Sequence, residues 1–379
     1  MPATSKTSAE AAVQLNRSGA RWVNPIGQPL AITYAFRASD DTYGDDHFGT
    51  NSFALFNASQ IAAAELALQA WADVANIAFT RVGGSGYSDH AALLFGGFQK
   101  DYPLIGPSVA GEGIHAYAYL PETADRQDQS WEGDVWVNDY WTYVTAPQIN
   151  GYGQAILVHE IGHALGLEHP GDYNRTDGQI LTYANDAAYR EDDAQYTVMS
   201  YFGEGNTGAN WGGNWTAVPM LHDIAAIQRL YGINTATRAG DTVYGFNSNA
   251  GRAWFDAAIS PLVICIWDAG GNDTLDLSGY ANNQVIDLQA GHFSDAGGTR
   301  RQCLDRRRGD DRERRWRRRP RSDHRQRGRE PVEWRRERRH DERACRQRRA
   351  GGRGRQRRHD RRRRIGSGTL FRCTRGLLR

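Results

Sequence analysis

One twelve-residue segment, which begins at His159 and reads His-Glu-Ile-Gly-His-Ala-Leu-Gly-Leu-Glu-His-Pro, constrains the fold of this chain more than any other. Residues four apart share one face of an α-helix, so His159 and His163 can direct their ring nitrogens at one metal ion. Glu160 is offset enough to reach a metal-bound water. Gly166 falls where the helix has to end, because glycine adopts the left-handed conformation at low cost and turns the chain to deliver His169. The segment therefore predicts a helix that ends beside a metal ion.

The spacing of these residues indicates zinc. Three imidazoles leave one coordination position open for water, as in catalytic zinc sites, and zinc lowers the pKa of that water toward about 7. A single buried histidine is usually a packed core residue, and the short HExxH pattern also arises by chance. The glycine and third histidine at fixed offsets make chance a poor explanation. We interpret His159, His163 and His169 as zinc ligands and Glu160 as the general base that takes the proton from the water.

The charge of the chain divides it into two unlike parts. Residues 1–299 hold 12 basic and 33 acidic residues, a net charge of −21, whereas residues 300–379 hold 34 and 11, a net charge of +23. The acidic part has a single cysteine, Cys265, which excludes an internal disulfide there. The N-terminus lacks the basic start and apolar run of a Sec signal peptide, and no apolar run approaches the length of a membrane span.

Hydrophobic periodicity predicts alternating strands and helices before and after the histidine segment. The predicted strands are Gln28 to Arg37, Ala91 to Phe95, Ala116 to Leu120 and Asp134 to Asn138. The predicted helices start at a Ser59 cap with apolar positions as far as Ile77, run from about Pro147 or Gly151 to Leu165, and run from about Met220 to Tyr231. We expect residues 1–27 to form a leader or propeptide-like segment and residues 28–235 an α/β or α+β catalytic domain.

Two further segments carry a resemblance to a known family. Thr197 to Phe202 reads Thr-Val-Met-Ser-Tyr-Phe, and Pro219 to Gly232 reads Pro-Met-Leu-His-Asp-Ile-Ala-Ala-Ile-Gln-Arg-Leu-Tyr-Gly. Together with the zinc segment they make residues 15–298 resemble the serralysins, which are secreted bacterial zinc endopeptidases of the metzincin clan. The resemblance implies an α+β domain in which a mixed sheet accompanies the active-site helix. It also implies that Met199 forms the apolar floor beneath the imidazoles.

The same resemblance assigns roles around the active site. Tyr201 matches the family's additional zinc ligand, whose phenol hydrogen-bonds the oxyanion once it leaves the metal; the alternative is an ordinary packed aromatic residue. The substrates would be proteins or peptides that lie extended along an edge strand, for which Ala116 to Leu120 and Gly133 to Asn138 are the candidates. We expect a monomer without a membrane or specific nucleic-acid partner. His47, His90, His115 and His222 have no partner at ligand spacing, so we expect ordinary packing or surface roles for them.

Glycine and aspartate dominate residues 236–298. The run Asp-Ala-Gly-Gly-Asn-Asp-Thr-Leu-Asp-Leu from Asp268 approximates the glycine-aspartate repeat of a calcium-binding parallel β-roll, the RTX repeat. The alternative is a plain Asp-Gly turn. Calcium requires many oxygen ligands, and the family builds its first calcium site at this junction. The candidate calcium ligands are Arg238, Gly240, Thr242, Asp268, Gly270, Gly271 and Asp273. By resemblance, we also expect a secreted, extracellular protein exported by a type I exporter that reads a C-terminal signal.

The pattern changes at Thr299, and we expect no strand or repeat beyond it. Arginine fills 34 of the last 80 positions and lysine none, which is unusual for a nucleic-acid-binding arm. Arginine codons of the form CGN, read one base later, encode Gly, Ala, Val, Asp or Glu. Shifted in this way, Gly309 to Gln326 permits Gly-Gly-Ala-Gly-His-Asp-Leu, which matches the β-roll repeat. We therefore hypothesise a one-base frameshift near codons 297 to 301, which the nucleotide sequence would test.

A chain made as written would end in a disordered, arginine-rich tail over residues 299–379. It would lack most of the β-roll and the C-terminal export signal. Cys303, Cys345 and Cys373 have no zinc-finger spacing and are expected to be incidental thiols. The alternative to a protease is thus an inactive or noncatalytic product whose tail binds nucleic acid or acidic surfaces without specificity, since its positive charge attracts phosphate.

Overall fold

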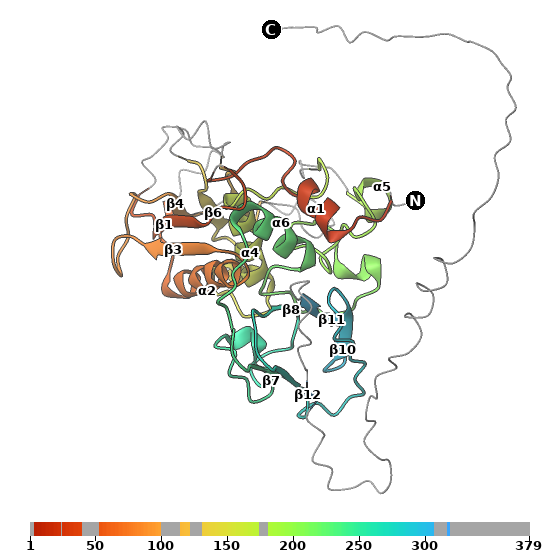
Figure 1. Cartoon of the computed structure of the whole chain (residues 1–379). Coiled ribbons are helices and arrows are strands. Elements are labelled where there is room, and N and C mark those ends of the chain that lie inside the picture. The colour runs from red at the N-terminus through yellow and green to blue at the C-terminus, as the bar shows by residue number, and fades with distance from the viewer. Residues whose placement is uncertain are drawn as a thin grey trace, which may run out of the picture. The chain divides into compact units, whose positions relative to one another are not determined.

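The computed structural model describes residues 4–23, 25–39, 53–99, 114–121, 131–173, 181–306 and 317–318, the backbone alone in 302–306 and 317–318 (Figure 1). Its helices are α1 Ser8–Gln14, α2 Ala58–Val74, α3 Thr142–Thr145, α4 Tyr152–Ala164, α5 Tyr183–Asp186 and α6 Leu221–Tyr231, with 3₁₀ turns η1 Glu204–Thr207 and η2 Ala253–Phe255. The strands of the first 235 residues are β1 Leu30–Phe36, β2 Phe53–Ala54, β3 Ile77–Arg81, β4 Leu93–Phe98, β5 Ala116–Ala118 and β6 Val135–Asn138.

These six strands form one mixed sheet. Its order is β3-β1-β4-β6-β5, and β2 pairs with β4 off this path. The pairs β1–β3, β1–β4 and β4–β6 are parallel, whereas β2 and β5 pair antiparallel with their neighbours. The predicted α+β domain with a mixed sheet is therefore confirmed. Because β6 is paired on both sides, Gly133 to Asn138 offers no free edge to a peptide; β5 ends the described sheet order.

The local sequence explains most element boundaries, with two corrections around α2. The cap of α2 is Asn57, not Ser59: the Asn57 side chain accepts hydrogen bonds from the backbone of Ser59 and Gln60, and Gln60 bonds back to the Asn57 backbone. This reciprocal capping box satisfies amide groups that the first helical turn leaves open. Ile77 does not belong to the helix but begins β3, because α2 ends at Val74 and the chain becomes extended.

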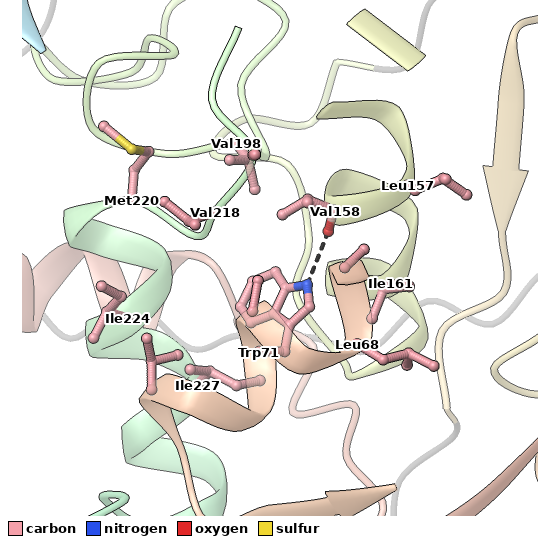
Figure 2. Close-up of a cluster of buried hydrophobic side chains, with 14 of the residues drawn as sticks. Leu68, Trp71, Leu157, Val158, Ile161, Val198, Val218, Met220, Ile224 and Ile227 are labelled. Carbon is pink, nitrogen blue, oxygen red and sulfur yellow. Dashed lines mark hydrogen bonds between the residues drawn. The ribbon is translucent and has the colours of Figure 1, made fainter. Parts of the chain in front are cut away.

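Trp71 fills the space between three helices. Its side chain is completely buried, and its indole N–H donates to the Val158 carbonyl in α4 at 3.0 Å (Figure 2). An indole buried in this way contributes a large apolar area and needs a partner for its polar N–H, which Val158 supplies. Other buried residues of this cluster include Leu68, Leu157, Ile161, Val198, Val218, Met220, Ile224 and Ile227. The cluster fixes α4 against α2 and α6.

The N-terminal segment contains a helix that periodicity does not predict. Thr7 and Glu10 form a capping box at the start of α1, and the Thr-x-x-Glu pattern is the sequence signal that indicates it. Ala11 and Leu15 are fully buried, and α1 packs against α6 (Figure 1). Part of the segment expected to be a leader thus contributes to the hydrophobic core. The assignment of residues 1–27 as a leader or propeptide-like segment stays a prediction.

Beyond residue 235 the strands are short and mostly parallel. They are β7 Val243–Gly245, β8 Ile264–Trp267, β9 Thr274–Asp276, β10 Phe293–Ala296, β11 Thr299–Arg306 and β12 Arg317–Arg318. They form two three-stranded sheets, β10-β11-β8 and β12-β9-β7, in which β11 runs parallel to β8 and β9 parallel to β7. This agrees with the expected start of a parallel β-roll.

The expectation of no strand after Thr299 is wrong for β11 and β12. Strand pairing uses backbone N–H and C=O groups, which every sequence provides, so β8 and β9 can pair with a chain that lacks apolar alternation. The rest of the arginine-rich tail, with Cys345 and Cys373, lies outside the described residues. None of the described helices is long and apolar enough to cross a membrane.

Replacing Trp71 with alanine should lower the free energy of unfolding by about 3–5 kcal/mol, because the change removes a fully buried indole and leaves a cavity between α2, α4 and α6. Urea denaturation measures this. Trp215→Ala is the matched control: Trp215 is 36% exposed, so its loss should cost about 1 kcal/mol or less. Equal losses for the two variants would contradict the central role of Trp71.

Candidate metal centre

Three imidazole nitrogens converge at the C-terminal end of α4. His159 and His163 lie on one face of the helix, and His169 arrives from the loop that follows it. The Nε2 atom of His169 is 3.0 Å from Nε2 of His163 and 3.3 Å from Nε2 of His159. A tetrahedral zinc ion with Zn–N bonds of about 2.0–2.1 Å holds its nitrogens about 3.3 Å apart. The triad therefore fits zinc.

Hydrogen bonds at the opposite ring nitrogens set the orientation of two imidazoles. Nδ1 of His159 lies 2.6 Å from the Val198 carbonyl, and Nδ1 of His163 lies 2.7 Å from the Leu167 carbonyl. A carbonyl only accepts, so each Nδ1 carries the proton and each Nε2 presents a lone pair to the centre. Burial lowers the pKa of His159 to about 4 and that of His163 well below its ordinary value. Both rings are thus neutral, as metal ligands must be.

Glu160 lies next to His159 in α4 and is buried. Burial raises the pKa of its carboxyl group to about 8, since the low-dielectric surroundings disfavour the charged form. A cation at the neighbouring triad would lower this pKa again by stabilising the carboxylate. These two opposing effects suit a group that gains and loses a proton near neutral pH.

Met199 lies beneath the helical turn that joins His159 and His163. Its side chain is fully buried, and a Cβ atom added to Gly162 would lie only 2.6 Å from its sulfur atom. The glycine therefore lets Met199 approach the helix backbone directly between the two ligand positions. This is the place expected for the apolar floor. No described contact makes Met199 a ligand, and its role stays a prediction.

Asp223 holds the methionine segment in place, and sequence reasoning missed it. This buried carboxylate in α6 accepts hydrogen bonds from the Thr197 hydroxyl and from the backbone N–H groups of Val198 and Met220. Since the Val198 carbonyl in turn bonds His159, α6 is connected to a metal-ligand position. Asp223 is the third residue of α6, where an acidic side chain can accept from the backbone N–H of the cap residue Met220, and this position is the sequence signal that marks it.

Two tyrosines flank His169. The Tyr201 ring centroid lies 4.3 Å from that of His169, and the Tyr201 side chain is 44% exposed, so it borders solvent beside the triad. Tyr173 stacks on His169 at 5.7 Å, and its hydroxyl donates to the buried Asp192 at 2.7 Å. The sequence predicted Tyr201 near the metal but gave no signal for Tyr173 and Asp192, whose partnership arises from tertiary packing.

The candidate calcium residues lie in two adjacent turns, one at residues 237–242 and one at residues 268–274. The Thr242 N–H donates to the Asp273 carboxylate at 3.1 Å, although the two residues are 31 positions apart. A Cβ atom on Gly271, whose φ is +117°, would lie 2.3 Å from the Gly240 carbonyl oxygen. Only glycine allows this approach. The turns thus bring together carbonyl and carboxylate oxygens, the ligands that calcium prefers.

The remaining candidate calcium residues occupy the same two turns. The Arg238 side chain bonds Asp73 and the Trp267 carbonyl, so this residue can offer only its own carbonyl group to a cation. Asp268 is buried, and its carboxylate accepts from Gly270 N–H and the Tyr244 hydroxyl. Within the described residues, the histidine triad is the one cluster of His, Cys, Asp or Glu side chains close enough to hold a metal ion.

Among the described residues, the other histidines that the sequence singled out stay apart from the triad. His90 is exposed, His115 bonds the Tyr152 hydroxyl at 3.1 Å, and His222 is buried with its ring near Tyr196. His47 lies outside the described residues.

Comparison with known proteins agrees with this geometry. The family model for the matrixins matches residues 36–200, and the model for the peptidase M10 serralysin C-terminal domain matches residues 233–303. Serralysin C of Dickeya chrysanthemi is 45% identical over 296 residues, which cover 76% of this chain and 58% of that protein. Metallopeptidase AprA of Pseudomonas marginalis is 44% identical over 305 residues, 78% of this chain and 60% of that protein.

This chain belongs to the serralysin family. Serralysin of Proteus mirabilis adds a third relative, 44% identical over 283 residues, 72% of this chain and 55% of the relative. The chain thus spans about three fifths or less of the curated relatives named here. Members of the serralysin family use zinc and calcium, and the histidine triad suits the first of these ions.

Gly166 is the residue that lets a serralysin-type loop leave α4 in this chain. Its φ is +99°, and a Cβ atom there would lie 2.3 Å from the Ala20 carbonyl oxygen. Gly166→Ala should therefore lower the free energy of unfolding by about 1–3 kcal/mol more than Gly84→Ala, measured by urea denaturation. Gly84 also has a positive φ, +64°, but nothing within 4 Å of its added Cβ, so it controls for backbone strain. Equal losses of unfolding free energy in the two variants would mean that the loop relieves the clash with Ala20 without destabilising the protein.

Proposed function

We propose that this chain is a secreted, zinc-dependent endopeptidase that hydrolyses peptide bonds of proteins. The observation that carries the proposal is the convergence of three Nε2 atoms within 4.8 Å of one another, next to the buried carboxyl group of Glu160. The match of residues 36–200 to the matrixin model supports the same reaction class. A buried acid adjacent to a water-binding metal is the arrangement that hydrolytic zinc enzymes use.

Each residue has a distinct part in the proposed reaction. Zinc, when held by His159, His163 and His169, supplies the positive charge that acidifies a water molecule and polarises a carbonyl group. The Glu160 carboxylate takes the proton from the attacking water and later donates it to the leaving amine. We propose Tyr201 both as an additional ligand and as a donor whose phenol hydrogen-bonds the carbonyl oxygen when negative charge develops there.

The edge strand β5 is the proposed peptide-binding element. It pairs antiparallel with β6, and β5 ends the described sheet order. A substrate in extended conformation would add to this edge through backbone hydrogen bonds, which bind many sequences because every residue supplies them. This supports a protease with broad protein or peptide substrates.

Glu160→Gln should leave zinc bound and lower kcat on casein by about 10²–10⁴-fold, since an amide cannot take the proton. Metal content by atomic spectroscopy and casein hydrolysis measure the two effects. Glu65→Gln provides the control, because Glu65 pairs with Arg81 away from the triad. This substitution should leave both the zinc content and the rate of casein hydrolysis unchanged. Turnover within a fewfold of the unmodified chain would refute Glu160 as the base.

We also propose that the turns at residues 237–242 and 268–274 bind calcium. Backbone carbonyl groups of Arg238, Gly240, Gly270 and Gly271, together with side chains of Thr242, Asp268 and Asp273, would be the ligands. Such ions would order the two turns, at whose ends β7 and β9 begin. The type I export that the resemblance implies belongs, in this proposal, to the product of the unshifted reading frame, which would carry the C-terminal signal.

Calcium should raise the melting temperature of the chain, and Asp273→Asn should remove most of that rise because a neutral amide binds calcium more weakly than a carboxylate. Differential scanning calorimetry with calcium and with a chelator measures the shift. Asp287→Asn is the matched control in the same region, as Asp287 is partly exposed and pairs with His292. If both variants respond to calcium as the unmodified chain does, Asp273 is not a ligand.

A further inference from the structure

The segment Gln14 to Trp22, which we name the N-terminal brace, lies against the loop that delivers His169. We define this third-ligand loop as residues 164–172. The contacts are the Gln14 side chain to the Pro170 carbonyl (2.8 Å), Glu168 N–H to the Leu15 carbonyl (2.7 Å), the Asn16 side chain to the Gly166 carbonyl (2.8 Å), Ser18 N–H to the Glu168 carboxylate (2.7 Å) and the Trp22 indole to the Ala164 carbonyl (2.8 Å).

Arg17 makes the contact closest to the metal ligand. Its guanidinium donates to the backbone carbonyl of His169 itself at 2.6 Å and to that of Gly171 at 3.2 Å. Two further N–H groups reach one oxygen of Asp172 at 3.0 and 2.7 Å. The planar guanidinium fixes several hydrogen bonds in one geometry, which a lysine ammonium on a flexible stem cannot do. Arg17 thus bridges the residues on both sides of Pro170.

The third-ligand loop depends on these contacts for its position. After Gly166 the chain is no longer helical, so the ladder of helical hydrogen bonds does not support His169. Each of the four residues from Glu168 to Gly171 is bonded to the brace. The Ala20 carbonyl also packs against Gly166, so closely that no side chain fits there, and the turn that leaves α4 is in direct contact with the brace.

We propose that the N-terminal brace positions the third zinc ligand, and that Arg17 is its principal positioning residue. The brace holds the His169 backbone where its Nε2 meets those of His159 and His163, and so removes the conformational freedom that zinc would otherwise have to order. This inference rests on the proposed zinc site. It also implies that N-terminal processing has to leave Gln14 to Trp22 attached to the catalytic domain.

Arg81 provides a matched control for Arg17. Arg81 likewise donates to one carboxylate, that of Glu65, and to two backbone carbonyls, those of Ser85 and Gly86. The two side chains are similarly exposed, 29% for Arg17 and 20% for Arg81. Removal of either guanidinium costs contacts to loop residues, and Arg17 makes two more of them, to the Gln14 carbonyl at 3.4 Å and to the Glu168 carboxylate at 3.7 Å. Only Arg17 contacts a residue of the histidine triad.

The test compares zinc affinity in the full chain by competition with a chromophoric chelator. Arg17→Gln should raise the zinc dissociation constant about 10–100-fold, the usual effect of losing a group that orients a metal ligand. Arg81→Gln should leave it within twofold of the unmodified chain, while the melting temperatures of the two zinc-free variants fall by similar amounts. Arg17→Lys should restore the zinc affinity only in part, because the ammonium group cannot make all the hydrogen bonds of the guanidinium. In cobalt-substituted protein, Arg17→Gln should change the visible absorption bands, which report coordination geometry.

A second variant covers the case in which Arg17→Gln does not fold. The Asp172 side chain is 92% exposed, so Asp172→Asn cannot disturb the core, yet it weakens the anchor of the guanidinium. We expect a smaller loss of zinc affinity, about 2–5-fold, from this change. Unchanged zinc affinity in folded Arg17→Gln, or in Asp172→Asn where Arg17→Gln does not fold, would overturn the inference, as would equal losses in the Arg17 and Arg81 variants.

The outcomes separate this inference from the proposed function. If the unmodified chain binds no zinc, the proposed zinc site itself is wrong. If the unmodified chain binds one zinc ion and Arg17→Gln binds it equally well, the site stands and the positioning role of the brace is wrong.

Discussion

The close packing of α4 against Trp71 and Met199 is the contact on which the rest of the structure depends. Gly162 makes it possible, because any side chain there would collide with the Met199 sulfur at 2.6 Å and with the Trp71 ring at 3.1 Å. One turn of the helix therefore contacts the core on one side and presents His159 and His163 on the other. Dense packing holds such a turn rigidly, since displacing it would open a cavity. The packing that stabilises the core thus also fixes the positions of His159 and His163.

Hydrogen bonds extend this rigidity from the core to the ligand nitrogens. Asp223 in α6 accepts from Val198 N–H, and the Val198 carbonyl accepts from His159. His163 is oriented by the Leu167 carbonyl in the loop that follows α4, whereas His169 in that loop is held by Arg17 from outside it. Each ligand position is thus supported by a different part of the chain. Preorganisation of this kind lowers the ordering cost of metal binding.

A shared carboxylate also joins the catalytic domain to the residues that follow it. Asp73, near the C-terminal end of α2, pairs with Arg238 and Arg252, each at 2.8 Å. The Arg238 side chain continues to the Trp267 carbonyl in β8. These largely buried charges compensate one another, as burial of unpaired charges would be costly. The turns proposed to bind calcium are thereby connected to the helix that carries Trp71.

The sequence by itself determined the chemistry of the site, because helical spacing places His159, Glu160 and His163 on a turn whatever surrounds it, and Gly166 marks its end. Alternation likewise predicted β1, β4, β5 and β6, but not β2 or β3. Only the tertiary structure decided what holds the site together. The contacts of Arg17 with His169 and of Tyr173 with Asp192 join residues far apart in the chain, so no local pattern predicts them. The same holds for β11, which pairs in parallel with β8, a strand far from it in the chain.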